Sequence, residues 1–289
     1  MRKNDSLELK IIRVVMPLLI YYGILLLVQS MFGFYAIAEE FLSIEDSDTA
    51  GYILAYNFLN NTDEYIKSHS LITNFIAAVI AVIILRVIMK KEFGDTVFDN
   101  YKQIGWREAL ILGFMGIFIA SGVGRLVNLF PLDNIIGSYS EVSKEFISNP
   151  IPFQILTLCI VSPIAEEVIF RGIMYRRLSE YSDIMTAVII SAIVFGVYHG
   201  NLVQGIYALL LGIMLCYVYD SCHTLAAPIF LHMICNAAAL IIMYFPVSRY
   251  ISNNIILNII IMLLEIFGMV YFTYRLYKLK NKEMEEERK

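Results

Sequence analysis

The chain has 289 residues, of which 58% are hydrophobic and only 17% are charged, and its mean hydropathy is +0.67. A soluble domain of this size carries about a quarter charged residues, so this composition indicates a polytopic membrane protein. The formal net charge of −4 gives no electrostatic basis for nucleic-acid binding. The four cysteines form no C-x-x-C pair, which argues against a disulfide framework and against a thiolate zinc site.

Eight apolar runs are candidates for membrane-spanning helices, since a span needs about 20 largely apolar residues. They cover residues 11–38, 71–89, 107–130, 151–171, 184–200, 203–219, 224–244 and 251–274. The first run is too long for a signal-peptide core, so we expect it to remain as an uncleaved span. The fifth and sixth runs are short and tightly joined. The sequence therefore predicts an all-α polytopic membrane protein of about eight transmembrane helices.

Basic residues predict the orientation of these helices, because cytosolic loops are enriched in Lys and Arg. With eight spans, four basic clusters fall on one side, and we expect a multi-pass protein of the cell membrane with both termini cytosolic. These clusters comprise Arg2, Lys3, Lys10 and Arg13; Lys90, Lys91, Lys102 and Arg107; Arg171, Arg176 and Arg177; and Arg275, Lys278, Lys280 and Lys282. The loop 221–223 is an exception, since it carries no Lys or Arg. The charged tail from Lys278 is expected to be solvated.

Two adjacent carboxylates, Glu166 and Glu167, stand inside the fourth apolar run. An ionised carboxylate at the bilayer centre costs at least about 2.5–3.5 kcal/mol, so such a residue is a functional-site candidate. Arg171 follows Glu167 by four residues and can neutralise it on the same helix face. Glu166 is rotated by about 100° and points elsewhere. Pro163 is expected to kink the helix and to widen a cavity beside the carboxylates.

Further polar residues lie in the next spans: His199 follows Phe195 by four residues, and Asn236 follows His232 by four. A carboxylate beside an imidazole can activate water as a general base, and His232 with Asn236 can donate hydrogen bonds to an oxyanion. Alternatively, Glu166, His199 and His232 ligate a divalent metal such as zinc. Either arrangement can hydrolyse an amide bond.

These three motifs, Glu166-Glu167-x-x-x-Arg171, Phe195-x-x-x-His199 and His232-x-x-x-Asn236, together resemble those of the CAAX prenyl protease type 2 and bacteriocin-processing family of intramembrane endopeptidases. The resemblance covers about residues 150–244. It implies an eight-helix endopeptidase whose cavity opens toward the cytosol, with Glu166 and His199 activating water and with His232 and Asn236 stabilising the oxyanion. Glu167, Arg171 and Phe195 would be supporting residues. Family members are often described as metalloproteases, and a metal-free glutamate mechanism has also been argued. The chain lacks H-E-x-x-H and is not a standard zincin.

On this basis we divide the chain into N-terminal helices (1–149), a catalytic core (150–245) and a last helix with a charged tail (246–289). Counted along their predicted spans, Glu166 lies toward the cytosolic end of the fourth span and His199 toward the far end of the fifth. Straight helices would therefore hold the two side chains at different depths in the membrane. Among the other polar residues, Arg125 and Asn128 either face the cavity or snorkel to the interface, and Asp220 and His223 form a solvated turn. The aromatic residues Tyr21, Tyr22, Tyr244, Phe245 and Tyr250 are expected at the membrane interface.

The expected partners are membrane lipids and a peptide or protein substrate, either lipidated or a bacteriocin precursor, and no nucleic acid. A non-catalytic bacteriocin-immunity or peptide-binding protein is the main alternative. An ion-coupled transporter with the carboxylates as a proton relay is a third hypothesis.

Overall fold

The structure, a computed structural model, describes residues 6–43, 64–94, 104–128, 149–245 and 254–287, and every long element among them is helical. Three helices come from the N-terminal part: α1 (Leu7–Ser43), α3 (Ser70–Phe93) and α4 (Trp106–Asn128). The central part contains α6 (Ile151–Gln154), α7 (Ser162–Glu167), α8 (Arg176–Tyr181), α9 (Ile184–Tyr198), α10 (Leu202–Cys222) and α11 (Ala226–Tyr244). The last helix is α13 (Ile255–Glu287).

Seven helices among the described residues are long and apolar enough to cross a membrane, and the fold class predicted from the sequence is confirmed. The fifth predicted span corresponds to α9, which has only 15 residues, or about 22 Å of helix. This length is less than the hydrocarbon thickness of about 30 Å. Asp183 fixes the start of α9 by accepting a hydrogen bond from the Thr186 amide. The hydrogen bond from the Thr186 hydroxyl also lowers the pKa of the Asp183 carboxyl below its usual value.

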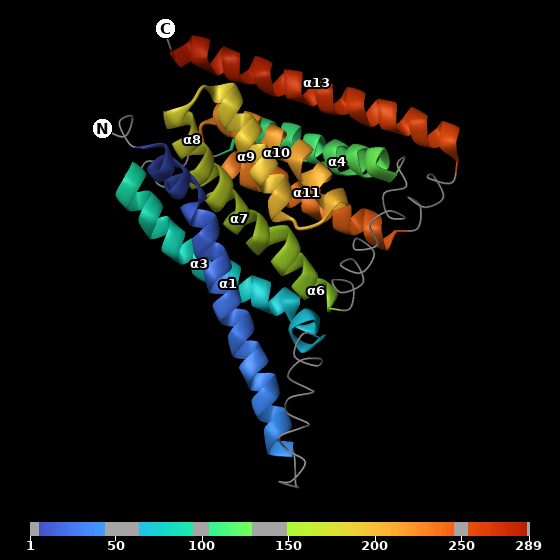
Figure 1. Ribbon diagram of the computed structural model, residues 1–289. Helices are drawn as coiled ribbons and strands as arrows, with labels where there is room; N and C mark the ends of the chain where they lie inside the picture. Colours follow the sequence, from blue (N-terminus) through green and yellow to red (C-terminus); the bar gives the residue numbers. More distant parts are fainter. Residues whose placement is uncertain (1–5, 44–63, 95–103, 129–148, 246–253, 288–289) are drawn as a thin grey trace.

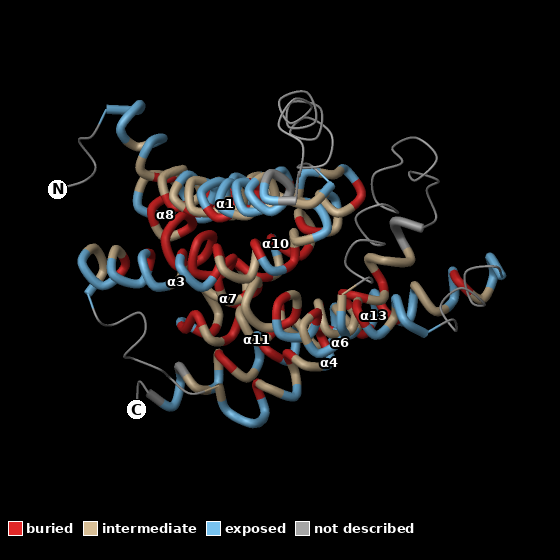
Figure 2. The backbone as a smooth tube through the Cα atoms, turned by 90° about the horizontal axis from the view of Figure 1, so that it is seen from below, coloured by how far each residue is buried: buried red, intermediate tan, exposed pale blue. Residues whose placement is uncertain are grey.

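The fourth span is one continuous helical segment, Ile151–Tyr181, in the middle of the molecule (Figure 1). It consists of α6, α7 and α8 joined by two π-helical stretches, η4 (Ile155–Val161) and η5 (Val168–Tyr175). Helices α1 and α3 pack on this segment, and so do α9, α10 and α11. Figure 2 shows the buried residues concentrated along α7, α8 and α10, whereas α1, α3 and α13 expose much of their surface. Helix α13 lies along α4 at the margin of the bundle.

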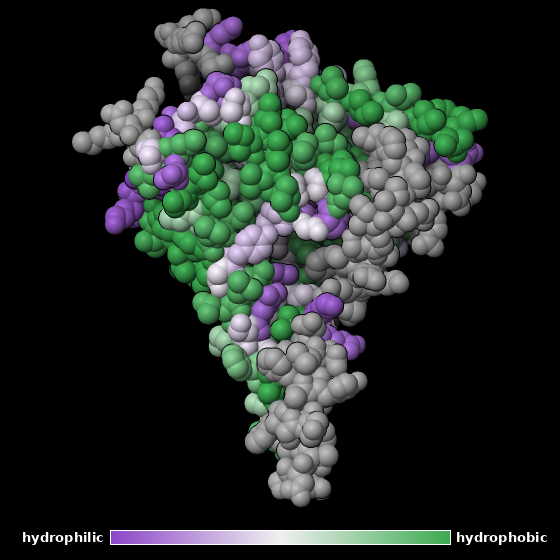
Figure 3. Space-filling view, in the orientation of Figure 1, coloured by the Kyte–Doolittle hydropathy of each residue, from purple (hydrophilic) through white to green (hydrophobic). Residues whose placement is uncertain are grey.

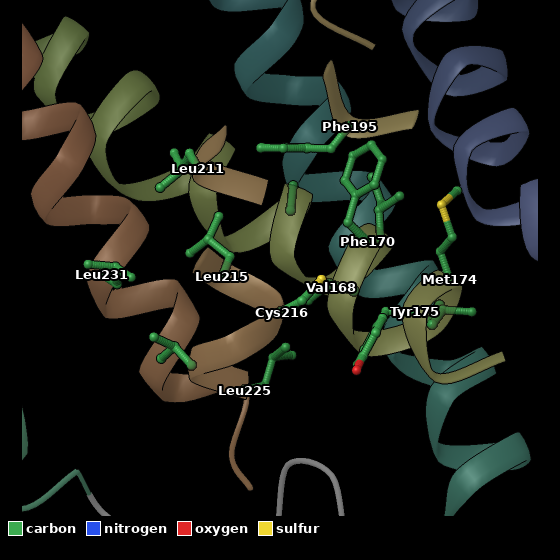
Figure 4. Packing of buried hydrophobic residues seen from close by; sticks show 14 of the residues in the cluster. Val168, Phe170, Met174, Tyr175, Phe195, Leu211, Leu215, Cys216, Leu225 and Leu231 are labelled. Atoms are coloured by element: carbon green, nitrogen blue, oxygen red, sulfur yellow. The ribbon is translucent and has the colours of Figure 1, made fainter. Parts of the chain in front are cut away.

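The core forms where the central segment meets α9, α10 and α11. Phe170 of η5 packs edge to face against Phe195 of α9, with ring centroids 4.8 Å apart. Figure 4 shows these two rings near Leu211 and Leu215 of α10, which are also buried. Hydrophobic side chains cover much of the outer surface in Figure 3, as expected for helices that face lipid.

The C-terminal tail differs in part from the expectation of a solvated helix end. Lys280 is buried because its ammonium pairs with Glu108 of α4 and, at 3.1 Å, with Glu283. Lys282 fits the expectation, since it is exposed and forms a loose pair with Glu286. The last turns of α13 are thus fastened to the start of α4.

Candidate active site

A cavity of about 300 Å³ lies between the central segment, α1, α3, α10 and α11, with the connector between α9 and α10 on its wall. Its lining contains four sequence-predicted site residues, Glu166, His199, His232 and Asn236, together with Phe195. The structure therefore brings three distant motifs to one cavity. The other polar or aromatic side chains of the lining are Tyr21, Tyr22, Asn74, Thr157, Ser162, Tyr198, Asn201, Gln204 and Tyr207.

The two adjacent carboxylates have different surroundings, as the helical geometry predicts. Glu167 is fully buried and accepts a 2.8 Å hydrogen bond from Nη1 of Arg171. Glu166 lines the cavity instead, and its side chain retains 12% exposure. Its Oε2 has no hydrogen-bond partner within the described part of the chain. Glu166 is thus the carboxylate that a substrate or a water molecule can reach.

Arg171 neutralises Glu167 from behind the cavity and does not line it. The guanidinium is completely buried, and its Nη2 donates to the Gly212 carbonyl at 3.1 Å. It also lies 4.5 Å from the ring centroid of Phe195, a cation–π contact. Gly212 permits this close packing, because an added Cβ would lie 3.3 Å from the Phe195 ring and 3.1 Å from the Ala192 backbone.

His232 stands between the two carboxylates. Its Nδ1 lies 2.9 Å from Oε1 of Glu167, so this nitrogen carries a proton when Glu167 is ionised. Its Nε2 lies 3.7 Å from Oε2 of Glu166, which is too long for a direct hydrogen bond. Glu167 therefore orients the imidazole and leaves Nε2 directed toward the cavity side, as carboxylates orient histidines in many active sites.

His199 reaches the cavity because α9 is short. It caps the C-terminal end of α9, and Nδ1 lies 2.8 Å from the Phe195 carbonyl oxygen. A protonated Nδ1 donates to this carbonyl, so Nε2 of the neutral ring is available as a base. The Phe195 ring packs edge to face against both His199 and His232, at centroid distances of 4.9 and 5.8 Å. A helix of 15 residues is too short to cross the hydrocarbon region, so its end can stop within it, and His199 at this end lines the same cavity as Glu166.

Asn236 is oriented by an irregularity of the central helix. The Ser162 amide donates to the Thr157 carbonyl, five residues earlier. In this register the Leu158 carbonyl would accept from residue 163, but Pro163 has no N–H. Nδ2 of Asn236 donates to the Leu158 carbonyl instead, at 2.8 Å. Pro163 therefore acts by freeing a carbonyl that fixes Asn236.

The metal alternative concerns the same three side chains of the cavity, Glu166, His199 and His232. No group of three or more His, Cys, Asp or Glu side chains within the described ranges is placed to hold a metal ion. The alternative ligand set of Glu166, His199 and His232 stays a prediction, because only Nδ1 of each histidine is engaged with a protein oxygen and Nε2 is the nitrogen that could act as a ligand.

The aromatic residues expected at the membrane interface have different surroundings, and among those that the structure describes Tyr21 is the one that is buried. Tyr21 and Tyr22 of α1 line the cavity, and their rings pack with Tyr198 at centroid distances of 5.9 and 5.8 Å. Tyr244 is exposed, and its hydroxyl donates to Oε1 of Gln154 at 3.1 Å. Phe245 is exposed as expected, and Tyr250 lies outside the described residues.

A second polar cluster in the bundle, formed by Ser121, Arg125 and Glu265, was not predicted from the sequence. Arg125 of α4 neither faces the cavity nor snorkels; its Nε contacts both carboxylate oxygens of Glu265 on α13 at 3.1 Å. Ser121 also donates to Glu265, at 2.5 Å. The signal was present in the sequence, because Glu265 is the one acidic residue in its apolar run. The side chain of Asn128 is outside the described part.

The turn after α10 is only partly solvated. Asp220 accepts a hydrogen bond from the Tyr175 hydroxyl and belongs to α10. His223 is exposed, as expected, and adopts a left-handed backbone conformation at φ 53°.

Comparison with known proteins finds one similar family and two similar proteins. Residues 148–238 match the family described as type II CAAX prenyl endopeptidase Rce1-like. The Bacillus subtilis (strain 168) protein named "Putative membrane peptidase YdiL" is 28% identical over 187 residues, which cover 63% of this chain and 75% of that protein. The Lactococcus lactis (strain IL1403) UPF0177 protein YaiF is 28% identical over 189 residues, 62% of this chain and 84% of that protein. No solved structure matches the chain significantly. The matches support a CAAX-protease-like membrane peptidase, and the chain is a multi-pass membrane protein whose residues 148–238 are similar to the type II CAAX prenyl endopeptidase Rce1-like family.

Proposed function

We propose that this protein is a membrane-embedded endopeptidase in which Glu166 and His199 activate a water molecule for attack on a peptide bond. One observation carries the proposal: of two adjacent carboxylates, Glu167 is neutralised by Arg171, while Glu166 faces the cavity beside two imidazoles. A desolvated carboxylate with an unengaged oxygen is suited to general-base chemistry.

In the proposed reaction, water transfers a proton to Glu166 as its oxygen attacks the substrate carbonyl. His199 accepts a hydrogen bond from this water through Nε2, while Nδ1 remains on the Phe195 carbonyl. The resulting oxyanion accepts hydrogen bonds from Nε2–H of His232 and from the second amide hydrogen of Asn236. In this role His232 carries a proton on both nitrogens, with Nδ1–H directed to Glu167. Glu166 then returns its proton to the leaving amine, which restores the carboxylate.

The proposed reaction assigns every step to side chains of this protein and to the attacking water. The proposed substrate is a peptide or protein segment that reaches the cavity from the membrane, either a lipidated peptide or a bacteriocin precursor. By the distribution of basic residues, we place cleavage near the cytosolic face of the cell membrane.

The test compares wild type with Glu166→Gln and His199→Ala in the native host, with mass spectrometry of released peptides. Glu286→Gln is the matched control, since this carboxylate is 65% exposed on the last turns of α13. We expect both site variants to lose at least about 10²-fold in turnover at normal expression, because general-base catalysis contributes 10²–10⁴-fold. Retained cleavage in Glu166→Gln would refute the assignment. Full cellular protection by that variant without any cleavage would favour the non-catalytic immunity or peptide-binding function.

A further inference from the structure

The peptide bond between Tyr198 and His199 lies at the point where α9 stops. Helix α9 ends at Tyr198 and α10 begins at Leu202, so the three residues of the connector lie outside both helices. The last carbonyls of a helix have no intrahelical donor and need another partner. The position of the His199 ring therefore depends on how this connector is held.

Local contacts hold the amide side and the far end of the connector. The His199 amide donates to the Gly196 carbonyl at 3.2 Å. Gly200 adopts φ +73°, a conformation that other residues rarely reach, and Asn201 caps α10 by accepting from the Gln204 amide at 2.8 Å. These contacts leave the carbonyl side of the Tyr198–His199 peptide bond to be fixed from elsewhere.

That fixing group comes from α1. The hydroxyl of Tyr22 donates to the Tyr198 carbonyl at 3.2 Å, across 176 residues of sequence. Tyr21, the preceding residue, is buried. The rings of Tyr21, Tyr22 and Tyr198 pack against one another with centroids 5.8–5.9 Å apart. Helix α1 precedes the segment that matches the family, residues 148–238.

We propose that Tyr22 is a positioning residue that acts through His199: its hydroxyl anchors the Tyr198 carbonyl and so fixes the imidazole at the depth of Glu166. The kinetic part of this inference rests on the proposed peptidase function, whereas the anchoring itself does not. It assigns to the N-terminal helix a part in completing a site whose other members lie on the central segment and on the helices after it.

Tyr22→Phe removes only the hydroxyl and keeps the ring packing. One net hydrogen bond is worth about 0.5–1.5 kcal/mol, so we expect about a 2- to 12-fold lower kcat with KM unchanged. The pH dependence of kcat should also change on the limb that depends on His199, because its alignment with the water changes. Tyr35→Phe is the matched control, since Tyr35 is an exposed residue farther along α1 and does not line the cavity.

Hydrogen exchange followed by mass spectrometry gives a second measurement that needs no substrate. We expect amides of residues 199–204 to exchange several-fold faster in Tyr22→Phe than in wild type or Tyr35→Phe, with those of α11 unchanged. Equal exchange in all three proteins would overturn the inference, whether or not the protein cleaves peptides. Faster exchange with a raised KM and an unchanged kcat would also overturn it, because Tyr22 would then bind substrate. Absence of any Glu166-dependent cleavage in wild type would refute the proposed function alone, and the exchange result would still decide the anchoring role.

Discussion

Removing the buried guanidinium of Arg171 should destabilise the fold more than any exposed arginine substitution. Arg171→Met keeps an unbranched, flexible side chain but removes the charge and the polar contacts. The change leaves the Glu167 carboxylate fully buried with only His232 beside it, and it leaves the Gly212 carbonyl without its side-chain donor. It also removes the cation over the Phe195 ring. Removing one partner of a buried ion pair lowers the free energy of unfolding by about 3–5 kcal/mol, and we expect Arg171→Met to fall within this range.

A double-variant cycle separates the ion pair from simple packing. Because a buried ion pair is costly to desolvate, Glu167→Gln combined with Arg171→Met should cost less than the sum of the two single changes, by at least about 1 kcal/mol. Full recovery is not expected, since Nδ1 of His232 loses its carboxylate partner. The measurement is equilibrium unfolding in detergent micelles, with the exposed Arg107→Met as control. The reasoning would be refuted if the free energies of unfolding of Arg171→Met and Arg107→Met agreed within about 0.5 kcal/mol. It would also be refuted if the effects of the two single changes added strictly in the double variant.

Three further substitutions test other parts of the structure. Pro163→Ala supplies a backbone amide that competes with Asn236 for the Leu158 carbonyl. We expect unchanged or higher thermal stability and a several-fold lower kcat. A kcat equal to that of wild type would contradict this role of Pro163. Gly196→Ala places a Cβ 2.8 Å from a backbone oxygen of α10, so the free energy of unfolding should fall by about 1–3 kcal/mol. An unchanged denaturation midpoint would count against the close approach of the two helices. Glu265→Gln leaves Arg125 without its carboxylate and should lower the free energy of unfolding by about 1–3 kcal/mol. We expect faster hydrogen exchange at the amides of α13 than at those of α10. Equal exchange in the two helices would show that this ion pair does not hold α13.

Hydropathy located the helices well because lipid imposes long apolar runs, and spacing of four residues identified the Glu167–Arg171 pair because both lie on one helix face. The separate directions of the two carboxylates followed from the rotation per residue alone. Such periodicity carries no information about partners on other helices. It therefore missed Glu265 as the partner of Arg125, and it assigned Tyr21 to the interface although the residue packs on Tyr198.

The irregular, π-helical backbone of the central segment was the other feature that the sequence pattern did not predict. The two π-helical stretches lie on either side of α7, which carries Glu166, and no spacing rule predicts them. Pro163 was recognisable as a break, yet its consequence, a carbonyl freed for Asn236, depends on the five-residue register observed in η4. π-Helical turns often occur at functional sites, and here one of them positions a predicted site residue.

The depth of the site follows from two opposite departures from an ordinary span. The central segment is longer than a span requires, with 31 residues, and it carries Glu166 near its middle. Helix α9 is shorter than a span, and its end, with His199, lines the same cavity as that carboxylate. A full-length fifth span would place the histidine near an interface, and the acid would then face only His232. The short helix is therefore what allows an acid and two imidazoles to share one cavity, and it makes the connector after α9, with its anchor on α1, the element on which the proposed chemistry most depends.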